Sequence, residues 1–103
     1  MKINFASALL DIKGNPILNG ENSFTLGEAA IMALITPIDG ERTPAQEKFK
    51  RAQLAQRVFI EPGLDYSVDD VALIKKLIGD GFVKPEVVFA AWNAIENGNG
   101  DKG

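Results

Sequence analysis

Helix-starting motifs divide most of this chain into four short helices. Residues 25–28 and 43–46 both fit the capping box, in which a Thr hydroxyl accepts a hydrogen bond from a free backbone N–H and a Glu or Gln three positions later bonds back to the Thr backbone. Residues 67–70 form a weaker version that ends in Asp. Pro44 and Pro85 stand where a first-turn proline costs no hydrogen bond. The pattern predicts helices near residues 25–35, 43–59, 67–79 and 84–96.

Prolines and glycines also mark where these helices stop. Pro37 ends the first predicted helix, because a proline inside a helix removes a backbone hydrogen bond. Pro62 and Gly63 end the second. Either Gly79 or Gly81 is expected to supply the left-handed residue that closes the third.

The N-terminal region favours a β-hairpin. Ile3 and Phe5 alternate with smaller or polar residues, and residues 13–16 (Lys-Gly-Asn-Pro) favour a turn. Residues 19–22 (Asn-Gly-Glu-Asn) favour a second turn. Residues 6–10 are equally compatible with a helix. Because an isolated hairpin is only marginally stable, its apolar face is expected to lie on the helices.

These elements predict an α+β protein in which an N-terminal β-hairpin packs on a bundle of about four short α-helices. The 103 residues are enough for one domain and too few for two, so we assign residues 1–96 to a single domain. Residues 97–103 contain three glycines and no apolar side chain, and we expect a disordered C-terminal tail there.

The predicted helices differ in the arrangement of their apolar residues. The first is apolar all round after Glu28, which predicts a central, enclosed helix. On the second, one side carries Phe49, Ala52, Ala55 and Phe59, flanked by Leu54 and Val58. The third is expected to bury Val71, Ile74, Leu77 and Ile78. Apolar residues at helical spacing usually face a core, so we interpret these stripes as core-facing.

The fourth predicted helix carries one apolar residue outside its main stripe. The stripe consists of Val87, Val88, Ala91, Trp92 and Ile95 and is expected to face the core. Phe89 falls beside it, where it either packs against a neighbouring element or belongs to an exposed patch.

Missing residue types exclude most catalytic chemistry. The chain has no His and no Cys, so Ser/His/Asp and Cys/His nucleophiles and the usual zinc sites are impossible. No Walker sequence and no GxGxxG at a strand–helix junction is present, and no motif implies a cofactor. The protein is therefore not expected to be an enzyme.

Acidic residues offer two weaker possibilities. Asp65, Ser67 and Asp69 have the spacing of the first calcium ligands of an EF-hand loop, but Lys76 stands where that loop has its closing Glu. Helix capping by Ser67 explains the same residues. Paired carboxylates such as Glu61 and Asp65 could run acid–base chemistry, yet nothing indicates a pocket around them, so solvated surface is the preferred interpretation.

The last two predicted helices also invite a helix-turn-helix interpretation, which the charges argue against. A recognition helix needs basic and amide side chains at its N-terminal end to reach bases and phosphates. Residues 84–89 are instead largely acidic and apolar, and Glu86 would repel phosphate. We reject direct DNA recognition by this helix.

Charge is unevenly distributed along the chain. Residues 42–57 hold five basic side chains against one acidic side chain, a local net charge of +4, whereas the rest of the chain has a net charge of −7 and the whole has −3. The basic side chains are Arg42, Lys48, Lys50, Arg51 and Arg57. They either pair internally, as Glu47 and Arg51 can at i, i+4, or form a docking face for an acidic protein or a phosphate backbone.

The chain also resembles small bacteriophage and prophage open reading frames of unsettled function. The resemblance rests on the turn at residues 11–14, on residues 24–26, 47–55 and 69–79, and on Trp92 in the last helix. It covers about four-fifths of the chain. It implies a phage-encoded accessory or assembly protein acting in the bacterial cytoplasm, and it implies no catalytic residues.

The functional expectation is a non-catalytic interaction protein. It would bind a phage or host protein or a second copy of itself, through a surface around Phe89 or through the edge of the hairpin. The alternative is weak nucleic-acid binding or host interference through Lys48, Lys50, Arg51 and Arg57, with an affinity that falls steeply with salt. A cytoplasmic location is expected, since no secretory signal or membrane-length apolar run is present.

Overall fold

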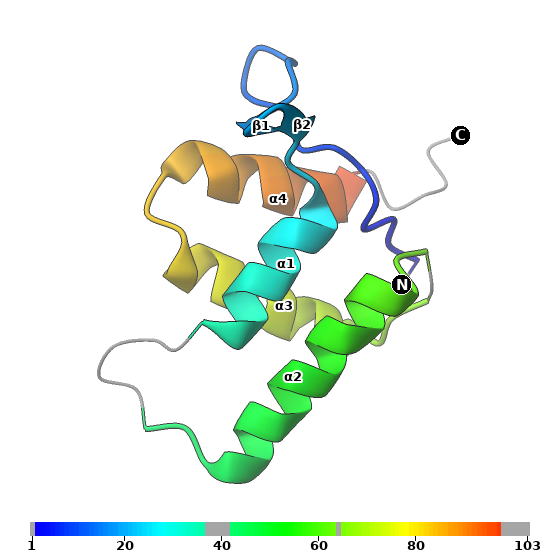
Figure 1. The fold of residues 1–103 in the computed structure, drawn as a ribbon, viewed down its shortest axis with the longest axis vertical. Coiled ribbons are helices and arrows are strands. Elements are labelled where there is room, and N and C mark those ends of the chain that lie inside the picture. Colours follow the sequence, from blue (N-terminus) through cyan, green and yellow to red (C-terminus); the bar gives the residue numbers. More distant parts are fainter. Residues whose placement is uncertain (1, 37–41, 64, 98–103) are drawn as a thin grey trace.

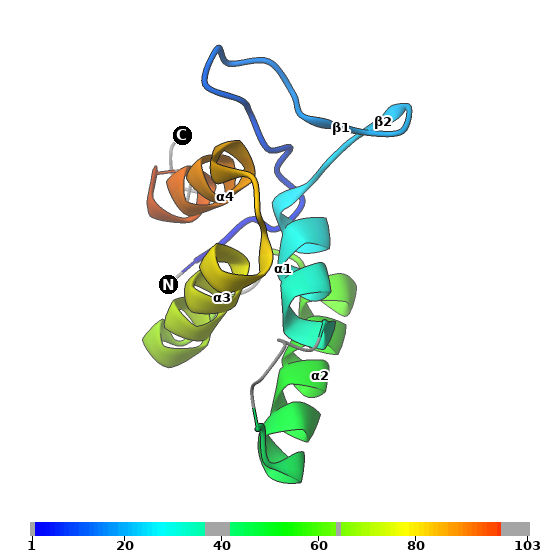
Figure 2. The same cartoon turned by 90° about the vertical axis from the view of Figure 1, so that its left-hand side faces the viewer.

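The computed structural model describes residues 2–36, 42–63 and 65–97 and contains a two-stranded antiparallel hairpin followed by four helices (Figure 1). The elements are β1 (Leu18–Asn19), β2 (Asn22–Ser23), α1 (Leu26–Ile35), α2 (Ala45–Ile60), α3 (Val68–Gly81) and α4 (Pro85–Asn97). This arrangement confirms the predicted α+β class and the helical bundle. Helix α1 packs against α2 on one side and against α3 on the other, and α4 lies against α3 (Figures 1 and 2).

The hairpin forms at the second predicted turn rather than the first. Leu18 pairs with Ser23, and Gly20 in the turn has a φ of +71°, a conformation that glycine tolerates. At the first turn, the Asp11 carboxylate accepts hydrogen bonds from the backbone N–H groups of Lys13 and Asn15. Backbone hydrogen bonds from the Asp11 N–H to the Asn15 carbonyl and from the Ile17 N–H to the Leu9 carbonyl also close this loop, around an isolated bridge between residues 10 and 16. The helix considered for residues 6–10 does not form.

The N-terminal segment is tied to the start of α1 by backbone hydrogen bonds. The N–H of Gly27 donates to the Phe5 carbonyl at 2.7 Å, and the N–H of Leu26 donates to the Ser7 carbonyl at 2.9 Å. A helix leaves its first N–H groups without intrahelical partners, so these bonds satisfy donors that would otherwise be buried unpaired. Gly27 is required for the contact, since a Cβ there would lie 2.9 Å from the Phe5 carbonyl oxygen.

Two of the three predicted side-chain caps are present. Thr25 and Glu28 form the full capping box of α1, and the Ser67 hydroxyl accepts from the Asp70 N–H at the start of α3. The cap predicted at Thr43 is wrong. Pro44 has an extended ψ of 153° and is itself the N-cap, so α2 begins at Ala45, and the proline side chain has no atom that could accept a hydrogen bond.

The ends of the helices agree with the prediction except at the third. Helix α1 ends at Ile35, one residue before its C-cap, while Pro37 lies outside the described residues. Helix α3 continues to Gly81 and ends at Phe82, whose backbone is extended. Neither Gly79 nor Gly81 is left-handed, so that prediction is wrong. Helix α4 includes Asn97, the first residue of the predicted tail, and residues 98–103 lie outside the described residues.

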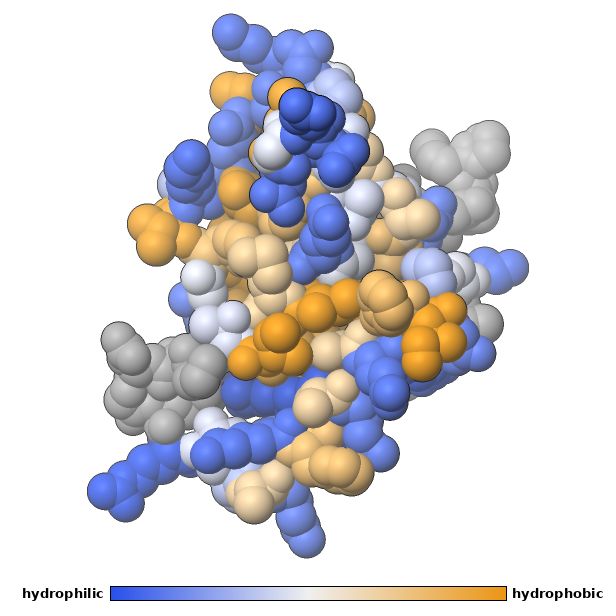
Figure 3. Space-filling view, in the orientation of Figure 1, coloured by the Kyte–Doolittle hydropathy of each residue, from blue (hydrophilic) through white to orange (hydrophobic). Residues whose placement is uncertain are grey.

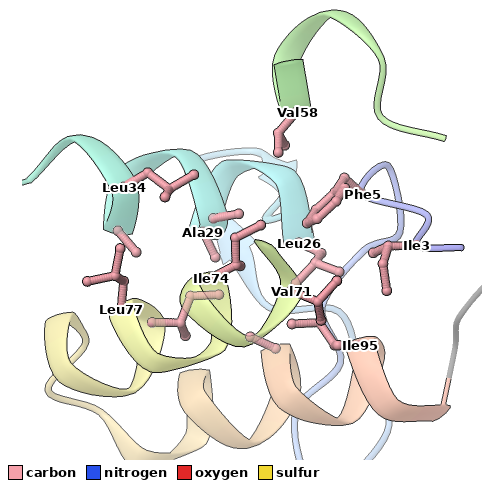
Figure 4. Packing of buried hydrophobic residues seen from close by; sticks show 14 of the residues in the cluster. Ile3, Phe5, Leu26, Ala29, Leu34, Val58, Val71, Ile74, Leu77 and Ile95 are labelled. Atoms are coloured by element: carbon pink, nitrogen blue, oxygen red, sulfur yellow. The ribbon is translucent and has the colours of Figure 1, made fainter. Parts of the chain in front are cut away.

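The core lies where α1 and α3 meet. Figure 4 shows side chains of α3 directed toward α1, and Ala29, Ala30 and Ile74 are fully buried. Phe5 brings the N-terminal segment into this core, where its ring meets the Tyr66 ring edge-on at 5.0 Å. The predicted burial of α3 is confirmed for Val71, Ile74, Leu77 and Ile78. Among the described residues the buried side chains are apolar apart from the hydroxyl of Tyr66, so apolar contacts dominate this core.

Two predictions about helix faces are wrong. Helix α1 is central but not enclosed, because Met32 and Ile35 face solvent. On α2 the expected core residues Phe49 and Phe59 are 65% and 77% exposed, and Ala52 is exposed as well. The residues that α2 buries are Ala55, which confirms that position of the predicted stripe, and the two predicted flanking residues Leu54 and Val58. The two sets lie on opposite sides of one helix, so only one of them can contact α1.

Candidate interaction surfaces

The acidic loop before α3 forms the start of that helix. Ser67 uses its hydroxyl to cap α3, and the Asp65 carbonyl accepts a hydrogen bond from Arg57 at 3.1 Å. In the part of the chain that the structure describes, no group of three or more acidic side chains is placed to hold a metal ion. Glu61 and Asp65, the predicted carboxylate pair, are both exposed.

The predicted basic surface on α2 is divided between solvent and internal contacts. Lys48 and Lys50 are exposed, and their positions two residues apart place them on different sides of the helix. Arg51 Nε lies 3.4 Å from a carboxylate oxygen of Glu47, which confirms the predicted i, i+4 pair. The four basic residues therefore do not converge on one face.

Arg57 joins α2 to the loop before α3. Its guanidinium lies 4.6 Å from the centre of the Tyr66 ring, and one of its Nη atoms lies 4.0 Å from the Asp70 carboxylate. Tyr66 is buried and donates its hydroxyl to the Glu61 carbonyl at 2.9 Å. Burial raises the pKa of the Tyr66 hydroxyl, an effect that the nearby Arg57 charge partly offsets. These contacts give Arg57 a structural role.

An open apolar groove runs between α3 and α4. It has a volume of about 720 Å³, within the range of pockets that bind ligands. Its lining consists of Val68, Val71, Ala72, Lys75, Lys76, Gly79, Asp80, Val88, Trp92, Ile95 and Glu96. The charged members at its rim are paired, Lys75 with Glu96 and Lys76 with Asp80. The groove thus offers an apolar surface to a ligand, and the charged residues at its rim are already paired with one another.

Trp92 forms one wall of this groove and is fixed in place. Its indole N–H donates to the Lys75 carbonyl at 3.1 Å, and the Lys75 ammonium lies 4.7 Å from the ring centre. Gly79 makes room for the ring, since a Cβ there would lie 3.2 Å from Trp92. The side chain is 37% exposed, so the prediction that it belongs to the core is wrong. The ring packs on α3 while part of it faces the groove.

Phe89 extends this surface along α4. It is 48% exposed, which settles its two predicted alternatives in favour of an exposed patch. Together with Val88, Trp92 and Asn93 it lines a smaller hollow of about 250 Å³ beside the main groove. Of the predicted site residues, Phe89 lines this hollow, and Lys50 and Arg57 line a different one of about 440 Å³ on α2.

The hairpin edge, the other predicted interface, is small. Strands β1 and β2 contain two residues each, so the edge presents few backbone groups to another strand. Leu10, Ile12 and Leu18 are exposed around it.

The structure also has a second hydrophobic surface, which the sequence analysis does not predict. Figure 3 shows this hydrophobic surface across the middle of the side of the molecule that faces the viewer in Figure 1, where α1 and the C-terminal half of α2 lie. On α2, Phe59 and Ile60 are 77% and 63% exposed. The sequence did contain the signal, because the apolar residues of α2 fall into two stripes rather than one.

Among the described helices, none has the length and apolarity to cross a membrane. Comparison of the chain with models of known protein families, with curated proteins and with solved structures finds no significant match.

Proposed function

We propose that this protein is a non-catalytic interaction module whose α3–α4 groove binds an amphipathic helix of a partner protein. The observation that carries the proposal is Trp92, a large aromatic side chain that is held rigidly yet remains exposed at an apolar groove. Aromatic side chains in such positions supply much of the energy of protein interfaces. Phe89 beside it enlarges the apolar area.

The chemistry of the groove favours apolar side chains over a small polar ligand. Small-molecule sites orient their ligands with a few polar groups inside a mostly closed pocket. Here Lys75 and Lys76 already have carboxylate partners, and the floor is formed by apolar residues such as Val71 and Ile95. A helix with apolar residues at i, i+3, i+4 and i+7 would fill such a groove between two helices.

A phage-type accessory or assembly role in the bacterial cytoplasm is the biological setting of this proposal. Its support is the sequence resemblance, and the genes that neighbour this one test it. Neighbouring head or tail genes would favour assembly, and early genes would favour host interference.

Nucleic-acid binding by α2 is the weaker candidate. Arg51 and Arg57 are engaged with Glu47, Tyr66 and Asp70. Using them to neutralise phosphates would break these contacts. Lys48 and Lys50 alone give a small electrostatic footprint compared with the several contacts of typical nucleic-acid binders.

The proposal is tested by selecting peptides from a displayed library of random helical sequences, with the full chain as bait. Because Trp92 is the only tryptophan, its fluorescence reports directly on the groove. We expect selected peptides to carry apolar residues at helical spacing and to change the Trp92 emission on titration.

Two valine-to-glutamate substitutions provide a test and its matched control. Val88→Glu places a charge in the groove lining and should weaken peptide binding by at least about tenfold. Val83→Glu introduces the same charge in the α3–α4 connection, where Val83 is 95% exposed and outside the lining, and should leave binding unchanged. Peptides that bind equally to both variants would show that the groove is not the binding site.

A further inference from the structure

The outer face of α2 carries a regular seam of exposed, uncharged residues. The seam consists of Ala45, Phe49, Ala52, Gln56 and Phe59, and all five are exposed. Their separations are 4, 3, 4 and 3 residues, the heptad spacing that matches the surface of one helix to another helix. The seam lies opposite the Leu54, Ala55 and Val58 face that packs on α1. Helix α2 thus has one satisfied apolar face and one without a partner among the described residues.

The position of α2 in the fold leaves this face accessible. The substantial packing of α2 is against α1, on one side only. Figures 1 and 2 show α2 at the periphery, with its N-terminal end extending past the C-terminal end of α1. From Ala45 to Phe59 the seam covers about 21 Å along the helix axis, enough for several layers of contact with another helix.

We infer that the seam is the interface of a homodimer in which two α2 helices pack antiparallel about a two-fold axis. The geometry points to a second copy because four of the five seam residues are placed symmetrically about position 54. Phe49 and Phe59 lie five residues on either side of it, and Ala52 and Gln56 lie two residues on either side. In an antiparallel pair each Phe49 therefore meets the partner's Phe59, and each Ala52 meets the partner's Gln56.

Charge also favours a copy of the same helix. None of the five seam positions is charged. The helix positions that flank the seam on one side, and would lie beside the partner helix, hold the uncharged residues Gln46, Gln53 and Ile60. No pair of lysines or arginines is brought together across this seam in spite of the basic character of α2. The small Ala52 gives the Gln56 amide room opposite it, and a single polar residue in such a seam fixes the register.

The size of the seam predicts modest affinity. Phe49 and Phe59 are 65% and 77% exposed in one chain. With ~150–250 Å² for each aromatic side chain, burying four rings in a dimer removes roughly 400–700 Å² from water. The remaining seam residues bring the total toward the ~1,000 Å² at the lower limit of specific interfaces. We expect a reversible dimer with a dissociation constant in the micromolar range.

Sedimentation equilibrium of the full chain tests the inference. The average mass should rise from 11.1 kDa toward twice that value as concentration increases from low micromolar to millimolar. Phe49→Asp and Phe59→Asp should each weaken the dimer by about 100-fold or more, because each change occurs twice per dimer. Both residues are exposed, so the variants should remain folded by circular dichroism.

Phe89→Asp is the matched control, since Phe89 is also exposed but lies on α4 away from the seam. It should leave the dimer intact. A mass that stays at that of the monomer, a dimer that survives both seam substitutions, or a dimer lost with Phe89→Asp would each overturn the inference. The last result would place self-association at the groove, so the two proposals fail separately.

Cysteine cross-linking tests the antiparallel arrangement in a chain that has no native cysteine. When Ala52→Cys and Gln56→Cys proteins are mixed and oxidised, the antiparallel seam predicts that the mixed disulfide dominates over disulfides within each variant. Dominance of the disulfides between identical variants would indicate parallel helices and would overturn the arrangement.

Discussion

About half of the residues in each of the helices α2 and α3 are apolar, yet the two helices distribute these residues differently between the core and the solvent. In α3 the large apolar side chains that form the core gather on one side, where Val71, Ile74 and Leu77 meet α1 (Figure 4). In α2 they occupy two opposite sides, and the larger aromatic residues Phe49 and Phe59 lie outside. The comparison shows that apolar content alone does not tell which residues stabilise a fold. Which apolar residues stabilise the fold depends on which face of the helix packs against a neighbouring helix.

The largest expected difference between the two helices concerns the free energy of unfolding. Ile74 on α3 has no exposed surface, so Ile74→Ala leaves a cavity between α3 and α1. We expect a loss of about 2–5 kcal/mol, measured by urea denaturation.

Phe59→Ala on α2 is the matched change for this comparison. It removes a larger side chain, but one that is 77% exposed, and should alter the free energy of unfolding by no more than about 0.5 kcal/mol in dilute protein. A loss comparable with that of Ile74→Ala would show that the outer face of α2 belongs to the core, and the comparison would fail.

A smaller difference is expected at the helix starts. Thr25 caps α1 with its hydroxyl, whereas Thr43 makes no such bond at the start of α2. Thr25→Ala should therefore cost about 1 kcal/mol of the free energy of unfolding, while Thr43→Ala should have almost no effect. Equal losses in the two thermal or urea unfolding curves would contradict the difference between the caps.

These local features explain why the sequence predicted the helices well. Capping by Thr25 and Ser67 and the first-turn position of Pro85 depend on residues within four positions of one another. The error at Thr43 has a local cause as well, because Pro44 follows it and takes the N-cap position.

The errors at the surfaces have a different origin. For α2 the sequence offers two stripes, and the choice between them depends on where α1 lies, which no property of α2 determines. The spacing of Trp92 predicts a core position, but its ring contacts Gly79 at the edge of the bundle and remains partly exposed. Phe89 could be named as a candidate from the sequence, whereas the groove beside it needed the packing of α3 against α4.

The smallest expected effect concerns the contact that links the two helices. Tyr66 precedes α3 and stacks with Arg57 of α2. Burial raises the pKa of the Tyr66 hydroxyl above its ordinary value of 10.0, so above pH 10 the unfolded chain loses this proton more readily than the folded one. Below pH 10 the protonated Tyr66 hydroxyl makes its full contribution to the free energy of unfolding. This contribution is lost as the pH rises through the pKa of the folded state. Tyr66→Phe should lack that part of the alkaline loss of stability.

The only tyrosine of the chain also allows the pKa to be measured directly, by the ultraviolet absorbance of its ionised form. Since the positive charge of Arg57 lowers the Tyr66 pKa, Arg57→Gln should raise it further in the folded protein. Lys50→Gln removes a charge from the same helix at an exposed position and should leave the titration unchanged. A Tyr66 pKa that responds equally to both substitutions would mean that Arg57 does not hold α2 to the loop before α3. Arg57 would then be available for an external partner, and the division of the basic residues between structure and surface would have to be redrawn.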